Sequence, residues 1–226
     1  MTSCEDGTSI QFLVPLEFIW KFQLGKMRYP LSSSTVLGLR CPNCDSEGLL
    51  TNDTEYNVDN FGSVLLNVTS CPHCGYRHTD VLTLTNREPV FLRVKIRSLK
   101  DLNIKVIKSG TATVDIPEFK ATITPGPNSE GYITNVEGIL EKIEDALTFM
   151  LSSVDSVRLR KGKKTLKQIR DAREGKSHFT LIIQDPLGNS GLVAEADQSK
   201  ITKRKLTNKE LARIKFGQYA VQINIL

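Results

Sequence analysis

The chain has 226 residues, of which 39% are apolar and 24% charged, the composition of an ordinary globular protein with one large domain or two smaller ones. No apolar run reaches the roughly 18 residues of a membrane-spanning helix, so the sequence argues against a membrane protein. Residues 1–89 carry a net charge of −4 and residues 90–226 a net charge of +9, which favours an acidic protein surface or nucleic acid as partner.

Residues 1–36 show no clear pattern. The apolar stretch 10–22 is interrupted by Pro15 and Glu17, and it lacks the basic start and small-residue cleavage site of a signal peptide. The run from Ser32 to Thr35 has the composition of a flexible lead-in. We therefore expect residues 1–36 to be an N-terminal extension that is disordered or that precedes a true start at Met27.

Two Cys-x-x-Cys pairs follow, Cys41 with Cys44 and Cys71 with Cys74, separated by 26 residues. This spacing is typical of a zinc ribbon in which four thiolates hold one ion, and it places the ribbon at residues 37–89. Gly75, directly after the second pair, suits a left-handed turn that aims backbone N–H groups at the sulfurs. Because four sulfurs would fill a tetrahedral shell, we expect the metal to be structural rather than catalytic.

Two other uses of these cysteines fit the sequence less well. Two disulfides would require an oxidising compartment, and nothing in the sequence indicates one. A one-iron site of the rubredoxin type would also use four thiolates, but no aromatic shell or redox partner is suggested. Cys4 is left over, and a chain with one spare thiol and no disulfide framework is expected in the reducing cytoplasm.

The segments around and after the second cysteine pair alternate between apolar and polar residues, as half-buried strands do. This alternation predicts strands in the ribbon at 64–69 and 79–84, and then at 90–97, 104–106, 111–115 and 119–124.

A helical period begins near residue 134. Apolar residues from Val136 to Leu151 fall on one face, and Thr134 with Glu137 has the spacing of a capping box. A second box, Thr165 with Gln168, predicts a shorter helix that ends at Gly175. These signals predict an antiparallel helical hairpin over 134–175. Its tip would carry the positive charges of Arg158, Arg160, Lys161, Lys163 and Lys164.

Strand character returns at 179–183, and a turn follows over 185–191. Thr207 with Glu210 forms a third capping pattern, and the alternation at 219–225 predicts a last strand. The predicted fold class is α+β: a four-cysteine zinc ribbon, then a β-rich domain over 90–226 with the helical hairpin inserted in it.

The sequence resembles the ZPR zinc-finger family in its archaeal single-module form. The resemblance rests on five motifs that occur in the family's order: Cys71 to Arg77, Lys108 to Glu118, Pro125-Gly126, Thr134 to Gly138, and Asp185 to Ser190. It implies a zinc ribbon, a helical hairpin and a β-rich domain of the double-stranded β-helix type. Eukaryotic members have two such modules, bind translation elongation factor one-alpha and assist its folding. The resemblance therefore also implies a chaperone-like role toward that factor.

Several residues are candidates for partner contact. His73 lies between two predicted ligands and is expected to point outward. Each Cys-x-x-Cys turn is called a knuckle, and Arg77 follows the second knuckle, Cys71 to Cys74. The alternative for Arg77 is a structural role near the thiolates. The Asp185 to Asn189 turn either joins two strands or presents Asp185 and Asn189 to a partner. The basic run, which consists of Arg158, Arg160, Lys161, Lys163 and Lys164, either faces solvent or binds an acidic surface or RNA phosphates.

No catalytic constellation is apparent, since His178 has no neighbouring cysteine and no phosphate-binding glycine loop occurs. We therefore expect a non-enzymatic, zinc-binding interaction module that binds an elongation factor. The alternative is a zinc-ribbon protein that binds nucleic acid in translation or transcription through its basic half.

Overall fold

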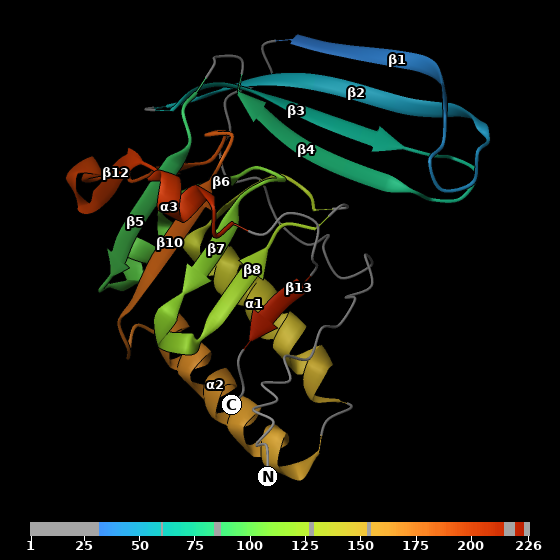
Figure 1. The fold of residues 1–226 in the computed structure, drawn as a ribbon. Helices are drawn as coiled ribbons and strands as arrows, with labels where there is room; N and C mark the ends of the chain where they lie inside the picture. Colours follow the sequence, from blue (N-terminus) through green and yellow to red (C-terminus); the bar gives the residue numbers. More distant parts are fainter. Residues whose placement is uncertain are drawn as a thin grey trace.

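A computed structural model describes residues 32–59, 61–83, 87–126, 129–152, 155–214 and 220–223. Figure 1 shows a long β-sheet lying across the top of a larger body of strands and helices. The upper sheet is antiparallel, in the order β1-β2-β3-β4. Its strands are β1 (Ser32–Arg40), β2 (Glu47–Val58), β3 (Gly62–Ser70) and β4 (Arg77–Thr83). This is the predicted ribbon, and it begins earlier than the sequence suggested.

The expected flexible lead-in at Ser32 to Thr35 is wrong. These residues pair with Glu55 to Asn52 of β2, so the predicted boundary at residue 36 falls inside β1. A strand could not be predicted here, because these small polar residues show no apolar–polar alternation. Strand β1 forms instead through backbone pairing with β2 at the edge of the sheet. The predictions for residues 1–31 lie outside the described residues.

The body contains a six-stranded sheet in the order β12-β5-β10-β7-β8-β13 and a three-stranded sheet in the order β11-β6-β9. The strands of the larger sheet are β5 (Val90–Ile96), β7 (Thr113–Ile116), β8 (Ala121–Thr124), β10 (Phe179–Asp185), β12 (Ile201–Lys205) and β13 (Ala220–Ile223). Those of the smaller sheet are β6 (Lys105–Lys108), β9 (Tyr132–Asn135) and β11 (Gly191–Val193). Short 3-10 turns lie at η2 (Leu99–Asn103), η3 (Pro117–Phe119) and η4 (Gln198–Lys200).

One hydrophobic core fills the body. It takes side chains from both sheets, such as Leu92, Leu181 and Val106, and from the buried stripe of α1 (Val136–Leu151), such as Leu140 and Leu147. The yellow helix α1 runs behind β7 and β8 in Figure 1. Strands and helices packed on one core give the predicted α+β class, with two sheets in the manner of a jelly roll.

Helix α2 (Ser156–Arg173) packs antiparallel against α1, as predicted, but both predicted capping boxes are wrong. The cap of α1 is Asn135, whose side-chain oxygen accepts from the Gly138 N–H at 2.8 Å. Helix α2 begins at Ser156, nine residues before Thr165, and its cap is Asp155, whose carboxylate accepts from two backbone N–H groups. The basic run is therefore the first half of a helix and not the tip of a hairpin.

Two packing details hold the hairpin together. A Cβ at Gly162 would lie 2.3 Å from Leu151, so the glycine lets α2 approach the end of α1 closely. Glu144 of α1 accepts from Arg170 at 2.7 Å and from Arg173 at 3.0 Å.

Among the described residues, no helix combines the length and apolar character that a membrane span needs. The third predicted cap is confirmed: Thr207 and Glu210 form a capping box before α3 (Asn208–Leu211).

Candidate metal centre and its surroundings

The four predicted ligands meet at the far end of the ribbon. The sulfurs of Cys41, Cys44, Cys71 and Cys74 all lie within 4.8 Å of one another. Two of the separations, Cys41 to Cys74 and Cys44 to Cys71, are 3.7 Å. A tetrahedral zinc ion with Zn–S bonds of about 2.3 Å requires sulfurs about 3.8 Å apart. The cage therefore fits one tetrahedral ion, and all of its ligands would come from this chain.

The two knuckles are built alike. In the first, the Cys41 N–H donates to the Ser46 carbonyl at 2.9 Å, and in the second the Cys71 N–H donates to the Tyr76 carbonyl at 2.8 Å. The residue after each pair is left-handed, with φ of 55° at Asp45 and 72° at Gly75. This confirms the prediction for Gly75, and Asp45 adopts the same turn because a short polar side chain tolerates it.

Hydrogen-bond donors near two of the sulfurs lower the pKa of the thiols and so favour the thiolate form that binds metals. The Ser46 hydroxyl lies 3.5 Å from the Cys71 sulfur, and together with the backbone N–H groups of Cys74 and His73 it lowers the pKa of that thiol to about 6. The Asn43 amide donates to the Cys74 sulfur at 3.5 Å and lowers its pKa as well. Burial raises the pKa of Cys41 to about 11, and a cation bound at the cage would favour its thiolate. Nothing in the residue pattern singles out Ser46 or Asn43, since their role depends on how the knuckles fold.

Each knuckle has one buried and one exposed ligand. Cys41 and Cys71 are buried together with Leu49 and are packed against Tyr76. Cys44 and Cys74 are exposed, and so are Pro42, His73 and Arg77. His73 thus points outward, as expected, on a surface that the cage would hold in shape.

Arg40 pairs with two carboxylates of the first knuckle. Its guanidinium donates to Asp45 and to Glu47, both at 3.1 Å. The side chain is thus engaged by carboxylates of the first knuckle. All three partners are exposed, so these pairs contribute at most about 1 kcal/mol each.

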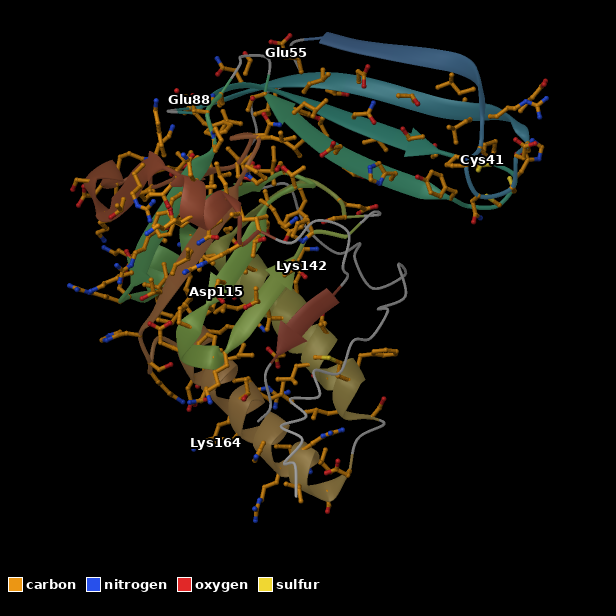
Figure 2. All side chains as sticks on the ribbon, in the orientation of Figure 1. Cys41, Glu55, Glu88, Asp115, Lys142 and Lys164 are labelled. Atoms are coloured by element: carbon orange, nitrogen blue, oxygen red, sulfur yellow. The ribbon has the colours of Figure 1, made fainter. Side chains whose placement is uncertain are left out.

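At its other end the ribbon packs on the body. Val58, Val64 and Val81 of the ribbon form a second hydrophobic cluster with Ile107 and Val193 of the three-stranded sheet. This shared cluster places the ribbon as a fixed arm. In Figure 2 its Cys41 end projects away from the body.

Polar contacts reinforce this joint. The Gly131 N–H donates to the Thr79 carbonyl at 3.0 Å, and the Thr83 hydroxyl donates to the Asn189 side chain at 2.6 Å. A Cβ at Gly191 would lie only 2.1 Å from the Phe61 ring. Asn189 was expected to contact a partner, but its side-chain oxygen lies in this internal joint.

The predicted partner contact through Asp185 is wrong, because its side chain is completely buried. Its carboxylate accepts four hydrogen bonds, from the hydroxyls of Ser109, Thr111 and Ser190 at 2.7–2.8 Å and from the Leu187 N–H at 3.0 Å. The turn chemistry itself was predicted, since Gly188 has a φ of 71°. The motif at 108–118 thus meets the motif at 185–190 inside the fold.

Lys108 is buried beside this network. Its ammonium donates to the Ser109 carbonyl at 3.0 Å and lies 5.4 Å from the centre of the Tyr132 ring. Burial lowers the pKa of Lys108 to about 8, although the nearby carboxylates of Asp185 and Asp80 favour the charged form. The sequence offered no sign of a buried lysine, because its position in β6 alone does not show what covers it.

The basic run lies far from the knuckles. Arg160, Lys161, Lys163 and Lys164 are exposed on the first half of α2, and half-buried Arg158 pairs with Asp155 at 3.5 Å. Lys164 is at the foot of the molecule in Figure 2, and Cys41 is at its upper right. The two predicted partner surfaces are therefore separate.

Comparison with known proteins identifies both the ribbon and the body. The family model described as the ZPR1 zinc-finger domain matches residues 35–86, and the model described as the ZPR1 jelly-roll domain matches residues 100–217. A ZPR1-like protein of Pyrococcus horikoshii is 37% identical over 186 residues, which are 80% of this chain and 82% of the relative. A ZPR1-like protein of Methanocaldococcus jannaschii is 34% identical over 79% of this chain and 89% of its own length.

Eukaryotic relatives match over a smaller share of their length. The protein named zinc finger chaperone zpr1 in Schizosaccharomyces pombe is 30% identical over 140 residues, which are 58% of this chain and 29% of the relative. On the matched zinc-finger and jelly-roll domains and on the likeness to the archaeal proteins, this chain belongs to the ZPR1 family.

Proposed function

We propose that this protein is a zinc-dependent, non-enzymatic interaction module that acts as a chaperone or cofactor for translation elongation factor one-alpha. The observation that carries the proposal is the cage of four sulfurs at the end of a projecting ribbon, with exposed side chains around it. The name of the fission yeast relative supports a chaperone role. The elongation factor as partner follows from the family resemblance.

Zinc would be held by Cys41, Cys44, Cys71 and Cys74 and would serve as a cross-link between the two knuckles. The apolar cluster at this end is small, with three buried residues and Tyr76 packed against them. Binding of a structural zinc ion contributes about 10–16 kcal/mol to folding in small zinc modules, far more than this cluster can supply. The docking surface near His73 and Arg77 would therefore exist only in the zinc-bound protein.

The exposed basic half of α2 would be a second contact surface, suited to an acidic face of the partner. It lies on the hairpin, away from the knuckles, so one partner could touch both only by spanning the body. A cytoplasmic location is part of the proposal, since a reducing compartment keeps the four thiolates available for metal.

Co-purification with a tagged, purified elongation factor tests the proposal. Wild type is compared with His73→Ala/Arg77→Glu at the knuckles and with Lys163→Glu/Lys164→Glu on α2. Lys209→Glu, at an exposed position on α3, serves as the control for added negative charge. We expect a stable complex with wild type and the control, and weaker complexes with the other two. A wild-type protein that forms no complex would refute the elongation-factor proposal.

Nucleic acid is the second candidate, favoured by the four exposed cations on the first half of α2. A salt titration separates it from the first. Binding to single-stranded RNA at nanomolar strength, with an affinity that falls steeply between about 50 and 200 mM salt, would support this alternative. Weak RNA binding together with a stable elongation-factor complex would support the main proposal.

A further inference from the structure

A pocket of about 410 Å³ lies on the outer face of the six-stranded sheet, where β5 and β12 meet the turn η2. In Figure 1 these strands are at the left edge of the body, on the side away from the knuckle end of the ribbon. Four cations line the pocket, Arg93, Lys95, Arg97 and Lys200. It is thus distinct from the metal centre and from the basic half of α2.

The alternation of β5 explains why cations gather here. Val90, Leu92, Val94 and Ile96 are buried in the core, so the residues between them face outward. Arg93 and Lys95 are exposed on this outer face, and Arg97 follows directly after the strand. Arg93 pairs in register with Thr202 of β12, which brings a hydroxyl-bearing residue into the pocket wall.

Asp101 gives the pocket a fixed wall. Only 6% of its side chain is exposed, and its carboxylate accepts from the Arg97 N–H, the Ser98 N–H and the Ser98 hydroxyl at 2.9–3.0 Å. It also accepts from the Lys200 ammonium at 2.7 Å, which holds this cation at the pocket. The acid is fully engaged, so it orients Lys200 without cancelling the other three charges.

Those three charges have no carboxylate partner within the described part of the chain. Two exposed cations further along β12 do have one, since Arg204 pairs with Glu210 and Lys205 with Glu88. Like charges gathered on one wall repel each other, and a bound anion relieves that repulsion.

We propose that this pocket binds a small molecule that carries phosphate groups. Guanidinium groups bind phosphate oxygens in bidentate fashion, and ammonium and hydroxyl groups add single hydrogen bonds. The volume is within the range of small-molecule sites, and four cations against one acid suit a ligand with two or more negative charges.

A single nucleic-acid strand fits this wall less well. The aromatic residue on the same face of β5, Phe91, is covered by the Arg204 guanidinium at 3.9 Å from the ring centre. A base would have to displace that cation, which is itself held by Glu210. Without a free stacking platform, the pocket favours a compact phosphate ligand over an RNA chain.

Isothermal titration of the full chain with inorganic pyrophosphate, at constant ionic strength, tests the proposal. The pocket variant is Arg93→Gln/Lys95→Gln/Arg97→Gln. The matched control, Arg160→Gln/Lys161→Gln/Lys163→Gln, removes the same charge from the exposed face of α2. We expect saturable binding of one pyrophosphate by wild type and control, and an affinity at least about tenfold lower in the pocket variant.

A second variant tests the fixed wall. Lys200→Gln removes the cation that this wall holds at the pocket, so pyrophosphate affinity should fall several-fold. Circular dichroism of each variant verifies that it is folded.

Three results would overturn the proposal. The first is no saturable binding by wild type, and the second is equal loss of affinity in the pocket and control variants, which would mean diffuse attraction to a basic protein. The third is tight binding of a single-stranded RNA oligonucleotide at this pocket without competition by pyrophosphate. None of these results depends on whether the elongation factor binds.

Discussion

Replacing Asp185 by alanine should destabilise the protein without directly affecting its exposed surfaces. The carboxylate is completely buried and accepts four hydrogen bonds. In the variant, the hydroxyls of Ser109, Thr111 and Ser190 and the Leu187 N–H would lose their shared acceptor inside the fold.

The expected cost follows from this count. A hydrogen bond to a charged group contributes about 1.5–3 kcal/mol, but bonds to one acceptor are not additive. Removing one member of a buried charged network typically costs about 3–5 kcal/mol. We expect Asp185→Ala to lower the free energy of unfolding by about 4 kcal/mol. Asp185→Asn should cost about half as much, because one acceptor oxygen remains.

Urea denaturation followed by circular dichroism measures these differences. Leu187→Ala is the control in the same loop, since this residue is 54% exposed and the change should stay within about 0.5 kcal/mol. A loss below 1 kcal/mol in Asp185→Ala would refute the reasoning. So would a variant of unchanged stability that no longer binds the elongation factor, because Asp185 would then be a contact residue after all.

Three further changes probe the ribbon, the joint and the buried lysine. Cys71→Ser should release the metal and remove the hydrogen-exchange protection of β1–β4 near the knuckles, while the body keeps its protection; unchanged protection throughout would contradict a metal-dependent ribbon. Gly191→Ala should destabilise by about 1–3 kcal/mol, because its Cβ would lie 2.1 Å from the Phe61 ring, and in a Phe61→Ala background the same change should cost less than about 0.5 kcal/mol. Equal costs in both backgrounds would show that this contact is not the cause. The pKa of Lys108 is about 8 in the folded protein and ordinarily 10.5, so the unfolded chain binds more protons between these values and the free energy of unfolding should rise across that pH range. Lys108→Met should reduce this rise, and an identical pH slope in variant and wild type would contradict the assignment.

Much of the fold could be predicted where one side of an element is buried. The alternation of β5 and the stripe of α1 follow from burial of every second residue in the strand and of one face in the helix. Strand β12 could not be predicted, because four of its five residues are exposed and show no alternation. The start of α2 was missed for a similar reason, since only Gly162, Ile169 and Ala172 of this helix are buried.

The ligands of the metal centre could be predicted because their spacing carries the geometry. The roles of Asp185 and Asn189 could not, because turn-forming residues look the same in a surface loop and in a loop enclosed by other segments. Asp185 is buried by partners 74 and 76 residues away in sequence, Thr111 and Ser109. The sequence motifs identified the right segments, but only the fold shows that the two segments contact each other.

The metal content of the purified protein tests the central claim most directly. Elemental analysis of wild type should find one zinc ion per chain, and Cys71→Ser, purified in the same way, should have lost it. A wild-type protein without zinc, or a Cys71→Ser variant that retains the full amount, would contradict the account of the ribbon as a zinc-held docking surface.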